Sequence, residues 1–138
     1  MAGVVLVDTG PLVALLDRSE RSRARVQAAF ASLEKADLVT SEAVVTEASY
    51  LLDFSVELQA NLQTLLTLGN IRVEPIEKNE RPRLASLIKK YDSLPMDYAD
   101  ATLVLLAERL GTTQVVSLDR RDFGVYRVGR KAFQILPR

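Results

Sequence analysis

Residues 4–11 read Val-Val-Leu-Val-Asp-Thr-Gly-Pro, and this stretch sets the expected architecture. The run Val4–Val7 contains only β-branched residues and Leu, which is typical of a strand buried on both faces of a parallel sheet. Asp8 ends the run, and Pro11 is well placed to open a helix that continues to about Leu16. The sequence therefore predicts a buried strand that passes directly into a helix.

The remaining hydrophobic patterns alternate between helix and strand. Helices are expected at residues 20–35, 41–54, 56–68, 78–91 and 97–110, and further strands at residues 37–40, 71–76, 114–118 and 134–136. Ser55 is positioned to cap the helix that follows it, and Gly111 to end the helix before it. This alternation predicts an α/β fold, a three-layer sandwich with a mainly parallel central sheet flanked by helices. Residues 1–138 are expected to form one domain, because repeats and linker-like segments are absent from the sequence.

The composition excludes several kinds of chemistry. With 138 residues, of which 48% are hydrophobic, the chain is large enough for one compact core. It contains no Cys and no His, which excludes thiol catalysis, disulfides, thiolate or imidazole metal sites and the commonest general base. Any catalysis must use carboxylates, hydroxyls, Lys, Arg or Tyr.

The net charge of zero hides an uneven distribution. Residues 1–69 contain nine acids and five bases, whereas residues 70–138 contain nine acids and thirteen bases. If five acids met in one cleft, the rest of the chain would carry five more bases than acids, so an acidic pocket could have a basic rim. Net neutrality therefore does not exclude a nucleic-acid ligand. The N-terminus does not resemble a secretory signal and no segment has the length of a membrane span, so a cytoplasmic protein without membrane association is expected.

Two acids follow buried strands. Asp8 comes directly after the first strand, and Asp119 follows the strand expected at 114–118. Ligands of parallel α/β sheets gather at the carboxyl ends of the strands, which favours a functional role for both residues. The alternative is a structural role, because Asp is also common in turns and at helix N-termini.

Glu47 lacks an ordinary salt-bridge partner. In a helix over residues 41–54 it falls at the edge of an apolar stripe made by Val44, Ala48 and Leu51. No Lys or Arg occurs between Lys35 and Arg72, so a local ion pair is excluded. A partly buried carboxylate needs a cation or hydrogen-bond donors, and a functional role is therefore favoured for Glu47.

Asp97 and Asp100 lie three residues apart at the start of the helix expected at 97–110. This spacing puts both carboxylates on one face of the helix. Asp97 is also well explained as a helix cap. Asp100 is harder to explain in that way, because its neighbours are apolar and the next base along the helix is Arg109. Two close carboxylates without a local base repel each other unless a cation lies between them.

Together these acids indicate a site for a hard cation. Carboxylate oxygens without nitrogen or sulfur donors select Mg²⁺ or Mn²⁺ rather than Zn²⁺. Because the chain has no His, we expect water activated by the metal to be the nucleophile of any hydrolysis.

Four segments resemble the motifs of the PIN-domain family, and in particular the toxin ribonucleases of bacterial and archaeal VapBC toxin–antitoxin pairs. The segments are Val7-Asp8-Thr9 before Pro11-Leu12-Val13, Val45-Thr46-Glu47-Ala48, Met96-Asp97-Tyr98-Ala99-Asp100-Ala101 and Ser117-Leu118-Asp119-Arg120-Arg121-Asp122-Phe123. No single motif is distinctive, but four in the right order over nearly the whole chain are specific. The sequence shows no departure from the family's pattern at the acidic positions.

The resemblance, combined with the arguments above, assigns residues to roles. The catalytic set is Asp8, Glu47, Asp100 and Asp119; the metal ligands are Asp8, Asp97, Asp100 and Asp119; the supporting residues are Thr9, Ser117 and Asp122. The resemblance implies a Mg²⁺- or Mn²⁺-dependent endoribonuclease that cleaves single-stranded RNA and leaves a 5′-phosphate and a 3′-hydroxyl. It also implies a homodimer, and a cognate antitoxin that restrains the toxin.

Other functions stay open to different degrees. A catalytically lapsed PIN-like module that binds RNA or a protein partner is the main alternative, although all the acids are present. A glycosidase is disfavoured, because the chain has no Trp and only four Tyr and four Phe to stack on sugars. The leucines of the helix at 56–68 that could form either core or dimer interface are Leu62, Leu65, Leu66 and Leu68.

Overall fold

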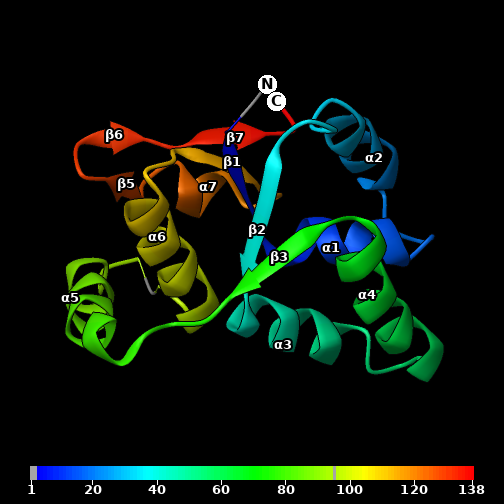
Figure 1. The fold of residues 1–138 in the computed structure, drawn as a ribbon, viewed down its shortest axis with the longest axis horizontal. Coiled ribbons are helices and arrows are strands. Elements are labelled where there is room, and N and C mark those ends of the chain that lie inside the picture. The colour runs from blue at the N-terminus through cyan, green and yellow to red at the C-terminus, as the bar shows by residue number, and fades with distance from the viewer. Residues whose placement is uncertain (1–2, 95) are drawn as a thin grey trace.

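The computed structural model of the chain describes residues 3–94 and 96–138. Its centre is a five-stranded sheet with the strand order β3-β2-β1-β4-β7, and all four pairings are parallel (Figure 1). The strands are β1 (Val4–Val7), β2 (Asp37–Ser41), β3 (Ile71–Glu74), β4 (Gln114–Val116) and β7 (Gln134–Leu136). The predicted α/β class with a parallel central sheet is confirmed.

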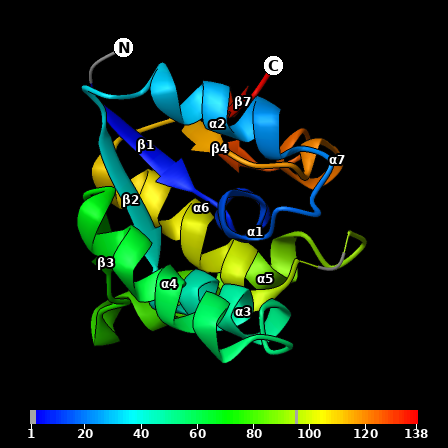
Figure 2. The same cartoon turned by 90° about the vertical axis from the view of Figure 1, so that its right-hand side faces the viewer.

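Helices cover both faces of this sheet. They are α1 (Thr9–Leu16), α2 (Arg23–Ala31), α3 (Glu42–Leu51), α4 (Val56–Leu68), α5 (Arg81–Lys90), α6 (Tyr98–Leu110) and α7 (Arg120–Phe123). In Figure 1, α5 and α6 lie on the left of the sheet and α1, α2 and α4 on the right. Figure 2, which looks from that right-hand side, shows α2 and α4 in front of the strands. The result is the three-layer arrangement that the alternating pattern predicted.

Side-chain caps explain where the helices begin. The carboxylates of Asp8, Asp97 and Asp119 and the hydroxyls of Ser41 and Ser55 each accept a hydrogen bond from a backbone N–H of the first turn. Each cap satisfies a donor that has no partner within the helix. The predicted cap at Ser55 is confirmed. So is the predicted end of the helix at 97–110, where Gly111 takes the left-handed conformation with a φ of 68°.

Several predicted boundaries were wrong. The helix expected at 20–35 covers only Arg23–Ala31, and just beyond its end the Ser32 hydroxyl donates to the carbonyl of Ala29. The helix expected at 78–91 is divided into a 3₁₀ turn, Lys78–Glu80, and α5. The strands expected at 71–76 and 114–118 are shorter and end at Glu74 and Val116.

Two short elements of the fold could not be predicted from the hydrophobic patterns of the sequence. The single turn α7 was predicted only as a turn or cap around Asp119. A two-stranded antiparallel hairpin, β5 (Arg127–Val128) with β6 (Lys131–Ala132), was not predicted at all. Elements of two to four residues are too short to show a hydrophobic period.

The strand β1, which ends just before a candidate site residue, and the helix α6, which carries another, are both largely buried in the core. Val5, Leu6 and Val7 of β1 are fully buried, as their unbroken apolar run predicted. In α6 every residue from Ala99 to Ala107 is buried, so this helix runs through the interior rather than along the surface.

The α4 leucines divide between core and surface. Leu62 and Leu66 lie in the core, whereas the Leu68 side chain is 78% exposed. In the part of the chain that the structure describes, no helix is long and apolar enough to cross a membrane.

Candidate metal centre

The carboxyl ends of β1 and β4 lie side by side, and a serine joins the acids that follow them. The pairing of the two strands is extended by a hydrogen bond from the backbone N–H of Asp8 to the carbonyl of Val116, at 2.9 Å. The Ser117 hydroxyl donates to Oδ2 of Asp8 at 2.7 Å and accepts from the backbone N–H of Asp119 at 3.0 Å. The rule that relates strand ends to ligand sites thus brings Asp8 and Asp119 to one edge of the sheet.

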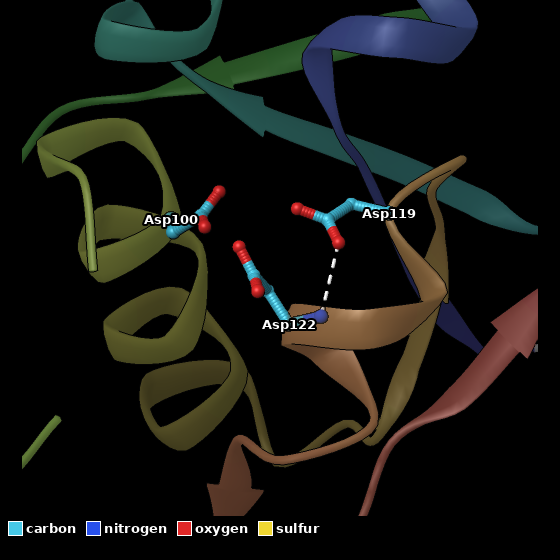
Figure 3. Close-up of side chains that lie close together, drawn as sticks. All are labelled: Asp100, Asp119 and Asp122. Carbon is cyan, nitrogen blue, oxygen red and sulfur yellow. Dashed lines mark hydrogen bonds between the residues drawn. The ribbon is translucent and has the colours of Figure 1, made fainter. Parts of the chain in front are cut away.

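Three carboxylates converge at this edge, and we call them the acidic cluster: Asp100, Asp119 and Asp122. Each offers one oxygen, and these oxygens all lie within 4.8 Å of one another. Asp100 comes from α6, Asp122 from α7, and Asp119 from the residue that caps α7 (Figure 3). Asp119 Oδ1 accepts the backbone N–H of Asp122 at 2.9 Å, which fixes the two acids of α7 relative to each other.

The other predicted site residues lie around the acidic cluster. Asp97 is exposed, and its Oδ1 accepts the backbone N–H of Asp100 at 2.7 Å, so it serves as the helix cap that the sequence allowed. Half-buried Glu47 accepts a hydrogen bond from the Thr9 hydroxyl at 2.5 Å. The predicted stripe beside Glu47 was partly wrong, because Val44 and Ala48 are buried but Leu51 is 49% exposed.

Burial and mutual repulsion raise the pKa values of the two most buried acids. Desolvation raises the pKa of Asp100 from 3.8 to about 8, and the charges of Asp8, Asp97 and Asp119 add to the rise, while the hydrogen bond from Tyr126 opposes it. Desolvation likewise raises the pKa of Asp8 from 3.8 to about 6, against hydrogen bonds from Ser117 and from the backbone of Thr9. Without a bound cation, the site therefore resists carrying its full negative charge.

Asp122 follows the same rule to a smaller extent. Its pKa is raised by desolvation first and then by the hydrogen bond and charge of Asp119, while the charge of Arg121 lowers it. The charge of Asp119 also raises the pKa of Asp100, so Asp119 acts on both other members of the cluster.

The donor set fits a hard divalent cation. The salt bridges among the described residues all involve other acids, and none joins a Lys or Arg to Asp8, Glu47, Asp97 or the acidic cluster. Converging carboxylate oxygens without a protein cation match the preferences of Mg²⁺ and Mn²⁺. The raised pKa values of Asp8 and Asp100 also favour a cation site, because a bound positive charge would stabilise the ionised carboxylates and lower these pKa values.

Tyr126 is a contact of the acidic cluster that the sequence did not reveal. Its hydroxyl donates to Oδ2 of Asp100 at 2.8 Å, and its side chain is fully buried. In sequence it is an isolated Tyr four residues after Asp122, without a motif around it. The only available signal was that a buried tyrosine hydroxyl needs a hydrogen-bond partner.

Ser117 offers a direct test of this network. Replacement by Ala removes one donor to Asp8 and one acceptor for Asp119, and it leaves a buried carboxylate with one partner fewer. We expect Ser117→Ala to lower the free energy of unfolding by about 1–3 kcal/mol in urea denaturation. Ser86→Ala is the matched control, because exposed Ser86 bonds only the carbonyl of Pro82 on the surface of α5, and it should change stability by less than about 0.5 kcal/mol. Equal losses in both variants would show that the Ser117 bridge does not hold the site together.

Comparison with known proteins relates the chain to a protein family and to a curated ribonuclease. A family model described as PIN domain matches residues 5–131. Ribonuclease VapC26 of Mycobacterium tuberculosis is 33% identical over 136 residues, which cover 96% of this chain and 100% of that protein.

Two solved structures share the fold. A crystal structure of Mycobacterium tuberculosis VapC20, described as a sarcin-ricin loop cleaving toxin, has a TM-score of 0.77 with 17% identity, over 90% of this chain and 97% of that one. A crystal structure of VapBC2 from Rickettsia felis, bound to a DNA fragment from its promoter, has a TM-score of 0.68 with 16% identity, over 98% of each chain. At these identities the likeness establishes the fold.

Proposed function

The chain belongs to the PIN-domain family, and from that premise we propose that it is a Mg²⁺- or Mn²⁺-dependent endoribonuclease that cleaves single-stranded RNA as the toxin of a toxin–antitoxin pair. The observation that carries the proposal is the acidic cluster, whose three oxygens lie within 4.8 Å of one another beside Asp8. The curated relative that is 33% identical is itself a ribonuclease, which supports the choice of RNA as the substrate.

We assign the site residues as follows. Asp8, Glu47, Asp100 and Asp119 are the proposed catalytic residues, and Asp8, Asp97, Asp100 and Asp119 the proposed metal ligands. We add Asp122 to the proposed ligands because its carboxylate lies within the acidic cluster. Exposed Asp97 also caps α6. Thr9 and Ser117 orient Glu47 and Asp8 by direct hydrogen bonds. In this scheme residues 1–138 act as one nuclease domain.

The side chains define what the protein itself contributes to the reaction. A bound divalent cation supplies positive charge against the scissile phosphate and makes water a stronger nucleophile. The acidic cluster would bind and orient that cation, and the Ser117 hydroxyl orients the Asp8 carboxylate by its hydrogen bond to Oδ2. Oε1 of Glu47 accepts a hydrogen bond from the Thr9 hydroxyl. The second oxygen of Glu47, Oε2, can then accept a hydrogen bond from a ligand. The absence of His leaves carboxylates as the proton acceptors nearest to the site.

We extend the proposal to partners and place of action. A cognate antitoxin is expected because one structural neighbour is described as a VapBC assembly. Exposed apolar side chains offer surfaces for an antitoxin or for a second copy in a homodimer: Tyr50, Phe54, Val56 and Leu68. The cytoplasm is the proposed place of action, since that is where the RNA substrates of such a toxin are found.

Incubation of the purified protein with unstructured RNA tests the proposed activity. We expect cleavage with Mg²⁺ or Mn²⁺, loss of cleavage with excess EDTA, and products with a 5′-phosphate and a 3′-hydroxyl. Single-stranded DNA of the same sequence is the control substrate. A protein that binds RNA but cleaves none of a broad panel in either metal would instead be the catalytically lapsed PIN-like module.

A further inference from the structure

Tyr126 connects the two helices that supply the acidic cluster. Its hydroxyl donates to Oδ2 of Asp100 on α6, at 2.8 Å. Its backbone N–H donates to the carbonyl of Asp122 on α7, at 3.1 Å. One residue therefore bonds both to the α6 acid and to the main chain of an α7 acid.

The ring of Tyr126 is held firmly by its neighbours. It packs edge-on against Tyr91, with ring centroids 5.0 Å apart, and against Phe123, with centroids 5.1 Å apart. Phe123 in turn packs edge-on against Phe133. A tyrosine side chain has only two rotatable bonds before the hydroxyl, and this packing restrains both. The hydroxyl thus has a defined position relative to the sheet.

Water is poorly placed to take over the role of this hydroxyl. Tyr126 is fully buried, and Asp100 is only 7% exposed. The structure records one side-chain donor to the Asp100 carboxylate in the described part of the chain, and that donor is Tyr126. Because the bond engages Oδ2, it restricts the rotation of the carboxylate. Among residues 3–94 and 96–138, no donor to Oδ1 is seen.

We infer that Tyr126 is a positioning residue that holds the Asp100 carboxylate in the orientation in which it binds a divalent cation. The inference rests on the proposed metal site, and it adds a residue outside all four sequence motifs. Partners that orient a metal ligand in this way typically change metal affinity by 10- to 100-fold when they are removed. A hydroxyl that only satisfied a buried carboxylate would affect folding without affecting the cation.

The test compares Tyr126→Phe with a matched variant, Tyr91→Phe. Both changes remove one buried hydroxyl from the same aromatic group and preserve the rings. The Tyr91 hydroxyl accepts the backbone N–H of Arg127 and contacts no acid of the cluster. We expect Tyr126→Phe to raise the Kd for Mn²⁺, measured by the electron paramagnetic resonance signal of free Mn²⁺, by about tenfold. Tyr91→Phe should change that Kd by less than about twofold.

A second measurement guards against a general loss of stability. Cation binding raises the unfolding temperature by mass action. The rise caused by saturating Mn²⁺ can therefore be compared between variants even when their unfolding temperatures without metal differ. We expect this rise to be smaller in Tyr126→Phe than in the wild type or in Tyr91→Phe. In cleavage assays, a higher Mg²⁺ concentration should restore the rate of Tyr126→Phe.

The outcomes separate this inference from the proposed function. If the wild type binds Mn²⁺ and Tyr126→Phe binds it equally well, the positioning role is overturned and the metal site stands. Equal weakening in both Tyr variants would also overturn it, because the effect would then come from packing. If the wild type binds no Mn²⁺, the proposed metal site fails, and the role of Tyr126 fails with it.

Discussion

Asp100→Asn is expected to abolish RNA cleavage and, in the same protein, to raise the unfolding temperature in the absence of metal at about pH 8.5. Both effects follow from the buried position of this carboxylate. Removing one group that stabilises the charge of a transition state commonly costs about 10²–10³ in rate, and the loss of a metal ligand should cost at least as much. In metal-free protein, however, the Asp100 charge is unfavourable, as its pKa of about 8 shows. The Asn side chain keeps an oxygen that can accept the hydrogen bond from the Tyr126 hydroxyl. The substitution therefore removes the charge and preserves the hydrogen bond.

The two readouts are a cleavage assay in Mg²⁺ and thermal unfolding in EDTA. Asp53→Asn is the matched control, because Asp53 is exposed and lies in the link between α3 and α4. It should leave both the rate and the unfolding temperature unchanged. Undiminished cleavage by folded Asp100→Asn protein would remove Asp100 from the site. A lower unfolding temperature would show that the carboxylate stabilises the metal-free fold.

The stability of the metal-free protein should decrease as pH rises from about 4 to about 8. Asp8 and Asp100 have folded-state pKa values of about 6 and about 8, both above the ordinary value of 3.8. Within this window the folded protein binds more protons than the unfolded chain, so raising the pH favours unfolding. The direction reverses in stronger acid, because the hydrogen bond from Arg109 lowers the pKa of Glu80 and the protonation of Glu80 then costs stability. The stability maximum of the metal-free protein is therefore expected at mildly acidic pH.

Thermal unfolding across this pH range, with EDTA and with saturating Mg²⁺, measures the effect. The decrease should be clear in EDTA and should shrink with Mg²⁺, because a bound cation stabilises the ionised carboxylates. The double variant Asp8→Asn with Asp100→Asn should show a much shallower decrease even in EDTA, with the remaining slope coming from the raised pKa of Asp122. A metal-free profile that rises steadily from pH 5 to pH 8 would contradict the raised pKa values.

Patterns within a few residues along the chain were enough to predict the parallel sheet and to select four of the candidate acids. The run Val4–Val7 gave the central strand, because a fully buried parallel strand must be apolar on both faces. Asp8 and Asp119 could then be identified from the strands that precede them. Asp100 followed from its apolar helical neighbours, and Glu47 from a long segment without bases. All four depend on contacts or periods within a few residues along the chain.

The rest of the site depends on contacts that are distant in sequence. Asp122 enters the acidic cluster because α7 is a single helical turn capped by Asp119, and a turn of that length has no period to detect. Tyr126 reaches Asp100 across 26 residues, and Thr9 reaches Glu47 across 38. Such pairs are decided by how the helices pack, which a single sequence does not reveal.

The two helices that supply the acidic cluster differ in how deeply they are buried. Asp100 lies on a helix whose residues 99–107 are all buried, whereas Asp119 caps and Asp122 belongs to a one-turn helix with exposed Arg120 and Arg121. Amide protons of α6 should accordingly be among the last to exchange with solvent, and those of α7 should exchange much earlier. Cations of different radius would then be accommodated by small movements of α7, while Asp100 stays where the core holds it. In the proposed site, tolerance for more than one metal would therefore depend on α7 rather than on α6.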